Sequence, residues 1–292
     1  MLAVLLIIPL LTAITIAFSD KKQTRFVALA GSLVTFVFSI ILLWQFDFHN
    51  TGDFQFASSW AWIPTLGLEF SLGMDAVSLM LVMLTTFLMP ITILGSYSAV
   101  QMRVKEFFAW ILILEAAMLG VFLARDLIVF YTCFEFTLIP MYFLIAVYGS
   151  SNRAKASIIF FLYTFTGSII TLAGLVYVAY QHLRISGIWT FDIAELTNTA
   201  ANLSPSQQGW VLLALCCGLA VKVPLFPVHT WLPLAHTEAP TAGSVILAAV
   251  LLKLGTYGLF RFALPMCPEA IATYAPVLAV LCIIGIIYTA LI

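Results

Sequence analysis

The chain has 292 residues, of which 63% are hydrophobic and only 9% are charged, and its formal net charge is −1. Soluble domains carry roughly 25% charged residues and about 45–50% apolar ones. The composition and a mean hydropathy of +1.11 therefore exclude an ordinary soluble protein and indicate an all-α polytopic membrane protein. No basic stretch suggests a nucleic-acid partner. The five cysteines form no C-x-x-C pair, so we expect inert core thiols and no metal site.

Nine apolar segments are long enough to cross the ~30 Å hydrocarbon core of a bilayer. In chain order they lie near residues 2–18, 26–46, 76–97, 107–123, 127–148, 156–180, 209–229, 242–262 and 274–292. No basic residue precedes the first segment, so we interpret it as a retained helix and not as a cleaved signal peptide. With the 19–25 loop placed inside, inside loops hold seven Lys and Arg residues and outside loops three, which follows the positive-inside rule and places the N-terminus outside.

Two of the expected outside segments are long. Residues 47–75 alternate polar and aromatic positions, as in FQFASSWAW, and contain turn signals at Pro64 and Gly67. This pattern predicts a small β-hairpin on the outer surface. Residues 181–208 are polar, and we expect a surface loop there, with room for a short amphipathic helix.

Four ionisable residues lie inside the expected spans: Glu115, Glu135, Lys222 and Lys253. Each glutamate is ten residues from Arg125, and because ten residues of helix rise about 15 Å, both should reach the membrane midplane. Burial disfavours the charged form of a carboxyl group, whereas a nearby ammonium favours it. A buried glutamate beside a buried lysine can therefore change its protonation state near neutral pH, as a proton relay requires.

Lys222 stands immediately before a predicted break in its helix. Pro224 and Pro227 lack an N–H, which should free the carbonyls of Ala220 and Val223 beside the lysine. Irregular backbone at membrane depth is tolerated where it faces protein or a water-filled cavity. We therefore expect a polar site at Lys222, in a lateral row with Glu135 and Lys253.

Simpler interpretations stand beside this one. Glu135 and Lys222 could be a neutralised pair that only holds helices together, Glu115 could be structural, and Lys253 could extend its ammonium to the interface. His229 and His236 fit either proton shuttles or ordinary loop histidines, because imidazole titrates between pH 5 and 8.

No metal or cofactor site is expected in this chain. The segment HTWLPLAHTE lacks the H-E-x-x-H spacing of a zinc site. A cysteine cluster, histidines paired at haem spacing and a G-x-G-x-x-G loop are also absent from the sequence. Asp75 and Asp126 lie at span ends, where helix capping is the simplest role.

Two segments resemble the proton-translocating, antiporter-like subunits of respiratory complex I, and most of all the chain M group: FYTCFEFTLIPMYFLI (130–145) and AVKVPLFPVHTWLPLAHTEAPTAGSVILAAVLLKLGTYGLFRF (220–262). The resemblance extends over essentially the whole chain. It implies that Glu135 and Lys222 form a charge pair that gates protons, that Lys253 links the input half-channel to a hydrated axis, and that Glu115 is the fourth-helix glutamate.

The same resemblance implies a fold of fourteen helices with two inverted five-helix repeats, which is a general transporter device. Residues 1–106 would be helices 1–3 with the 47–75 hairpin, and residues 107–262 the first repeat (helices 4–8) with a broken seventh helix. Residues 263–292 would begin the second repeat. We therefore expect the chain to be the N-terminal part of a longer gene product.

The resemblance also implies an enzyme subunit: a translocase within NADH–quinone oxidoreductase, in a bacterial inner membrane, with sister antiporter-like and small membrane subunits as partners. NADH, FMN, iron–sulfur clusters and quinone would belong to those partner subunits. One position departs from the family pattern, because Leu234 replaces the acid of a W-L-P-D-A-H loop and puts that carboxylate's role in proton entry in doubt. Alternatives are an Mrp-type cation/proton antiporter, a membrane subunit of an energy-converting hydrogenase, a passive helical scaffold and, least favoured, a membrane metalloenzyme.

Overall fold

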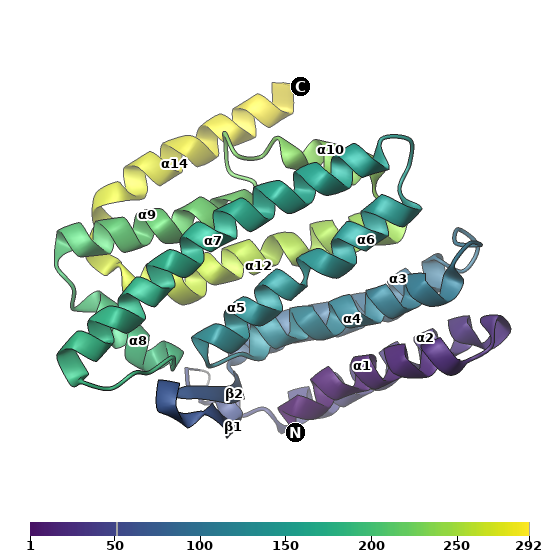
Figure 1. The fold of residues 1–292 in the computed structure, drawn as a ribbon, viewed down its shortest axis with the longest axis horizontal. Coiled ribbons are helices and arrows are strands. Elements are labelled where there is room, and N and C mark those ends of the chain that lie inside the picture. Colours follow the sequence, from purple (N-terminus) through teal and green to yellow (C-terminus); the bar gives the residue numbers. More distant parts are fainter. Residues whose placement is uncertain (51, 292) are drawn as a thin grey trace.

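The computed structural model describes residues 1–50 and 52–291 as an elongated bundle of helices that run roughly along one axis (Figure 1). Thr51 of the expected hairpin segment and Ile292 of the expected last span lie outside the described residues. The elements are α1 (Leu2–Phe18), α2 (Lys21–Gln45), β1 (Gln55–Ile63), η1 (Pro64–Leu66), β2 (Leu68–Met74), α3 (Ala76–Gly95), α4 (Val104–Leu123), α5 (Leu127–Phe136), α6 (Leu138–Tyr148), α7 (Arg153–Ser186), α8 (Ile193–Ala201), α9 (Pro205–Lys222), α10 (Trp231–Glu238), α11 (Thr241–Ile246), η2 (Leu247–Leu251), α12 (Leu252–Gly258), η3 (Leu259–Ala263), α13 (Leu264–Met266) and α14 (Pro268–Leu291).

The expectation of a multi-pass helical membrane protein is confirmed. Within the described ranges, seven helical segments are long and apolar enough to cross a bilayer: Lys21–Gln45, Ala76–Gly95, Val104–Leu123, Leu127–Tyr148, Arg153–Ser186, Thr241–Met266 and Pro268–Leu291. The other two expected spans correspond to α1, which has 17 residues, and α9, which has 18.

Three details differ from the sequence prediction. Helix α7 continues to Ser186, so the first residues of the expected 181–208 loop are helical, and α8 is the short amphipathic helix within it. The span 127–148 is interrupted at Thr137, between α5 and α6. The span 241–266 contains two π-helical stretches, η2 and η3. Such local changes of helical pitch depend on packing and leave little trace in an apolar sequence.

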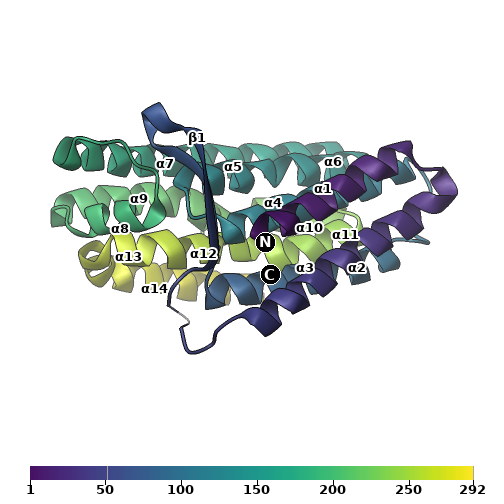
Figure 2. The ribbon, with the colours of Figure 1, turned by 90° about the horizontal axis from the view of Figure 1, so that it is seen from below.

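The aromatic alternation in 55–74 does form a hairpin. Strands β1 and β2 pair antiparallel, and the turn ends at Gly67, whose φ of 65° suits a residue without a Cβ. Figure 2 shows the hairpin lying across the bundle, with α7, α8 and α9 extending beyond it. The Arg125 N–H donates to the Ser71 carbonyl at 2.9 Å, which fastens β2 to the turn between α4 and α5.

Hydrogen bonds fasten the loops at the two ends of the bundle. At one end the Arg25 guanidinium donates to the Val100 carbonyl at 3.0 Å, and the Tyr148 hydroxyl donates to the Arg103 carbonyl at 2.9 Å. These loops are among the expected inside loops, which hold seven Lys and Arg residues. At the other end the hairpin and the α4–α5 turn meet the segment before α8, where the Leu127 N–H donates to the Phe191 carbonyl at 2.8 Å.

Helices α7 and α9 cross closely because their facing residues are small. A Cβ added to Gly218 would lie 2.7 Å from the Gly167 carbonyl oxygen, and one added to Gly167 would lie 3.1 Å from the Gly218 Cα. The Thr171 hydroxyl donates across this contact to the Ala214 carbonyl at 3.1 Å. Small residues that let two backbones approach are a common device of helix packing in membranes. This crossing sets the position of the C-terminal end of α9.

Substitution of Gly218 by alanine should therefore destabilise the protein, although alanine is the better helix former. The added methyl meets backbone that cannot move without separating α7 from α9, and such overpacking costs about 1–3 kcal/mol. Gly209→Ala on the same helix is the matched control, because its nearest neighbour would be the Tyr274 ring at 3.7 Å. Thermal unfolding in detergent should show a lower midpoint for Gly218→Ala only. Equal midpoints for both variants would contradict the close crossing.

Candidate functional site

Lys222 is the last residue of α9 and is 4% exposed. The chain then makes a non-helical passage past Pro224 and Pro227 and resumes as α10 at Trp231. The expectation of an unpaired Ala220 carbonyl is wrong, because this oxygen accepts the Leu225 N–H at 2.8 Å. The next carbonyl, that of Val221, accepts the Trp231 indole N–H at 2.9 Å. A backbone N–H of the break and a side-chain N–H of α10 therefore satisfy these two carbonyls.

The ammonium of Lys222 points at the junction of α5 and α6. Its Nζ lies 3.2 Å from the Thr137 Oγ1 and 3.5 Å from the Phe134 carbonyl oxygen. The same Nζ lies 4.1 Å from the centroid of the Phe134 ring, within the range of a cation–π interaction. A hydroxyl, a carbonyl and an aromatic face thus surround this buried charge.

Glu135 adjoins this site, but it does not form an ion pair with Lys222. No carboxylate oxygen lies within 4.0 Å of the Lys222 Nζ in the part of the chain that the structure describes. Both Glu135 carboxylate oxygens are buried and have no hydrogen-bond partner among those residues. Ser168 of α7 lies beside Glu135, yet its hydroxyl donates to the Phe165 carbonyl at 2.9 Å. Glu135 and Lys222 therefore lie near each other, but the carboxylate and the ammonium are more than 4.0 Å apart.

Glu115 lies in α4, and its side chain is completely buried. Over residues 1–50 and 52–291, neither of its carboxylate oxygens finds a hydrogen-bond partner. Buried polar groups almost always have one, so two unpartnered carboxyl groups on adjacent, packed helices are exceptional.

Lys253 is apart from this group, and the structure does not join it to Glu135 and Lys222 in a contiguous row. Its side chain is exposed, and its Nζ donates to the Ala248 carbonyl at 3.0 Å, within the π-helical stretch of the same segment. Gly255, two residues later, packs closely against Lys222: a Cβ added there would lie 2.9 Å from the Lys222 Cβ.

The two candidate histidines occupy different surroundings. The buried His229 ring lies between Phe226 and Tyr288, with ring centroids 5.7 and 5.5 Å away, and its Nδ1 has no partner among the described residues. His236 in α10 is half-buried, and its backbone carbonyl accepts the Ser244 hydroxyl at 3.1 Å.

A buried ion pair between α3 and η3 was not predicted from the sequence. Asp75 does cap α3, by accepting the Ser78 N–H at 2.9 Å, but its other oxygen lies 2.6 Å from the Arg261 Nη2. Arg261 also donates to the Tyr257 hydroxyl at 3.2 Å and lies over the Phe54 ring. No local signal in the sequence joins these residues, because 186 positions separate Asp75 from Arg261.

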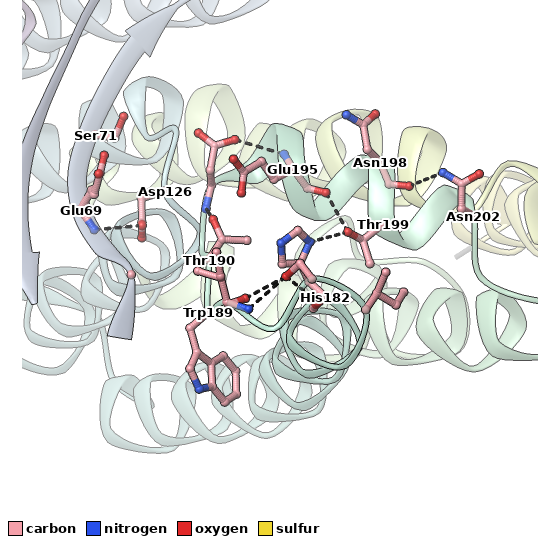
Figure 3. A pocket seen from close by; sticks show the side chains of 15 residues that line it. Glu69, Ser71, Asp126, His182, Trp189, Thr190, Glu195, Asn198, Thr199 and Asn202 are labelled. Carbon is pink, nitrogen blue, oxygen red and sulfur yellow. Dashed lines mark hydrogen bonds between the residues drawn. The ribbon is translucent and has the colours of Figure 1, made fainter. Parts of the chain in front are cut away.

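A cavity of about 840 Å³ opens between the hairpin, the start of α5 and α8 (Figure 3). Its polar groups have structural roles. Asp126 caps α5 through the Ile128 and Val129 N–H groups, as the sequence predicts, and Asp192 caps α8. Burial raises the pKa of Asp126, although hydrogen bonds from Val129, Glu69 and Ile128 oppose that rise. His182 bonds the Thr199 hydroxyl at 2.7 Å. We assign this cavity no chemical role.

A family model described as "NADH:quinone oxidoreductase/Mrp antiporter, TM" matches residues 124–292, more than half of the chain. The chain belongs to this family. The matched range contains Glu135, Lys222 and Lys253, whereas Glu115 precedes it.

Named relatives of this antiporter-like family agree with that assignment. NADH-ubiquinone oxidoreductase chain 4 of Arabidopsis thaliana is 44% identical over 291 residues, which cover 98% of this chain and 57% of the relative. NADH-quinone oxidoreductase subunit M of Rhodobacter capsulatus is 43% identical over 304 residues, which cover 100% of this chain and 59% of the relative. The chain thus spans somewhat more than half the length of these relatives.

Solved structures place the fold in the same group. A chain of respiratory complex I from Thermus thermophilus with bound NADH matches with a TM-score of 0.81 and 29% identity, over 96% of this chain and 56% of that one. A chain of the Mrp complex from Dietzia sp. DQ12-45-1b matches with a TM-score of 0.78 at 21% identity, over 92% of this chain and 29% of that one. The second likeness concerns the fold alone.

Proposed function

We propose that this chain is a proton-translocating membrane subunit of an NADH–quinone oxidoreductase. Quinone reduction elsewhere in the complex would drive proton movement through Glu135, Lys222 and Lys253. The observation that carries the proposal is a buried ammonium at a helix break, next to a buried carboxyl group that it does not touch. Intramembrane charges are expensive, and functional charge movement is the main reason that they persist. The relatives named above support the choice of complex.

The finer architecture is part of the same proposal. Nine helices would cross a bacterial inner membrane, with the N-terminus outside and the hairpin on the outer surface. Residues 1–106 would form the N-terminal part, residues 107–262 the first five-helix repeat, and residues 263–292 the start of a second repeat within a fourteen-helix protein. The gathering of Lys and Arg at the end of the bundle that carries the 19–25 loop supports this orientation.

The partners and cofactors follow from the same assignment. Sister antiporter-like subunits and small membrane subunits would flank the chain in the bilayer. NADH, FMN, iron–sulfur clusters and quinone would be bound by partner subunits, so the role left to this chain is proton movement.

The candidate residues have different roles in proton transfer, which follow from their positions. Lys222 is the movable charge, because its long side chain can place the ammonium either at the α5–α6 junction or beside Glu135. When the ammonium approaches Glu135, it stabilises the carboxylate, and when it leaves, the carboxyl group favours binding a proton. Glu115, on the helix packed against α5, and His229 and His236, around α10, are the candidate groups for delivering protons to this pair.

A second candidate function is cation/proton antiport of the Mrp type. The observation in its favour is the fold shared with the Mrp complex chain. The two functions differ in their energy source: the oxidoreductase subunit requires NADH oxidation, whereas an antiporter requires a cation gradient and works without NADH. Measurement of vesicle acidification with NADH in sodium-free buffer separates them.

The central test is Glu135→Gln in the full-length protein, within its complex in membrane vesicles. We expect NADH-driven acidification to fall about 100-fold, because proton-transfer groups contribute roughly 10²–10⁴-fold to a rate. Quinone reduction should fall with it, while the complex still assembles, because glutamine has the same shape. The control is Glu106→Gln, which removes an exposed acid at the start of α4. Unchanged pumping per electron in Glu135→Gln would make Glu135 structural and favour the passive scaffold.

A further inference from the structure

Among residues 1–50 and 52–291, the groups that contact the Lys222 ammonium include no acid. The Thr137 hydroxyl, the Phe134 carbonyl and the Phe134 ring all lie within bonding range, at 3.2, 3.5 and 4.1 Å from the Nζ. Thr137 is fully buried and Phe134 is nearly so. We call these three groups the neutral seat.

We propose that Thr137 is a positioning residue for the charge movement, and that the neutral seat holds the Lys222 ammonium whenever it is separated from Glu135. The proposal rests on the proposed function for its biological meaning. The seat itself is a property of the geometry and can be tested separately.

The hydrogen bonds of Thr137 orient its oxygen for this task. Its hydroxyl donates to the Phe134 carbonyl at 2.7 Å, so the hydroxyl proton is engaged and the oxygen lone pairs are available to the ammonium. Lys222 carries only donors, so Thr137 must act as the acceptor in the 3.2 Å contact. The hydroxyl thus links the charge to the backbone of α5.

The helix geometry separates the seat from Glu135. Residues three apart on a helix share a face, which places Phe134 and Thr137 together. Glu135 is about 100° around the helix from Phe134, because an α-helix has 3.6 residues per turn. The ammonium therefore has two positions to choose from, and a rotation of the Lys222 side chain moves it between them.

The neutral seat lowers the free energy of the separated state. If the Lys222 ammonium moved away from Glu135 and found no other acceptor, its buried charge would be uncompensated. Proteins avoid that state. A neutral hydroxyl and carbonyl hold the charge more weakly than a carboxylate does, so the ammonium can return. Removal of the hydroxyl should therefore shift Lys222 toward Glu135 and slow its departure.

The first measurement is Thr137→Val in the full-length protein within its complex. We expect NADH-driven acidification to fall about tenfold, which corresponds to the low end of the value of one hydrogen bond to a charged group. Thr137→Ser keeps the hydroxyl and should restore most of the rate. The matched control is Thr85→Val, which removes another buried threonine hydroxyl whose hydrogen bond goes to its own helix, at the Leu81 carbonyl. If Thr137→Val does not assemble, Thr137→Ala replaces it with the same expectation.

The second measurement is a cryo-EM structure of the Thr137→Val complex. We expect the Lys222 Nζ within about 4 Å of a Glu135 carboxylate oxygen, the distance of an ion pair. An Nζ that stays beside Phe134 in this variant overturns the positioning role of Thr137, whatever the transport assay shows. Full pumping by Thr137→Val, together with loss of pumping in Glu135→Gln, overturns the seat and leaves the proposed function standing. Full pumping in Glu135→Gln overturns the proposed function, and the position of the Nζ still decides on the seat.

Discussion

Replacement of Lys222 by methionine should abolish proton pumping without weakening the fold. Methionine has a similar length and is apolar, so it removes the buried charge and keeps most of the packing. Because an ammonium at a helix centre costs about 2.5–3.5 kcal/mol, we expect equal or higher stability. NADH-driven acidification should fall at least about 100-fold, the lower value for a group that transfers a proton.

The combination of lost transport and retained stability is the informative result. A passive scaffold in which Lys222 only holds helices together requires the opposite combination: lower stability and normal pumping in whatever complex survives. Lys155→Met, which removes an exposed lysine near the start of α7, is the control for the loss of one positive charge. Acidification by Lys222→Met at the rate of the Lys155→Met control would exclude Lys222 from the path.

Arg261→Met should destabilise the protein by more than Gly218→Ala does. The side chains of Arg261 and Asp75 are only 14% and 11% exposed, and the substitution leaves Asp75 as an unpaired buried carboxylate. Removal of one partner of a buried pair costs about 3–5 kcal/mol. Asp75→Asn should also lower the stability of the protein, because it leaves the Arg261 guanidinium without its carboxylate partner. Asparagine can still cap α3 through its side-chain oxygen.

A double-mutant cycle measures this pair directly. The variant Asp75→Asn/Arg261→Met should recover much of the loss, because neither charge is then stranded. Arg103→Met is the exposed counterpart: its pair with Glu106 has side chains 56% and 50% exposed, and such pairs contribute about 0.2–1 kcal/mol. Unfolding of each protein in detergent gives the comparison. Additive effects of the two single changes would show that Asp75 and Arg261 do not depend on each other.

Local patterns in the sequence were sufficient to predict that the protein is a membrane protein, that it has the hairpin, and where most of its helices lie. Each of these depends on a short-range regularity: the length of an apolar run set by bilayer thickness, the two-residue alternation of a strand, or the capping preference of aspartate at Asp75 and Asp126. The cost of intramembrane charge likewise makes Glu115, Glu135, Lys222 and Lys253 candidates on the strength of the sequence alone. Their roles remain proposals.

The tertiary structure alone decided which groups each charge contacts. Lys222 meets Thr137 and Phe134, and Arg261 meets Asp75, because helix packing brings together side chains that are 85, 88 and 186 positions apart in the chain. The tertiary structure also pairs the Ala220 carbonyl with the Leu225 N–H and leaves the Lys253 side chain exposed. The physical reason is that hydropathy depends only on the composition of a segment. The partner of a buried polar atom depends on the rotation, depth and crossing of several helices at once.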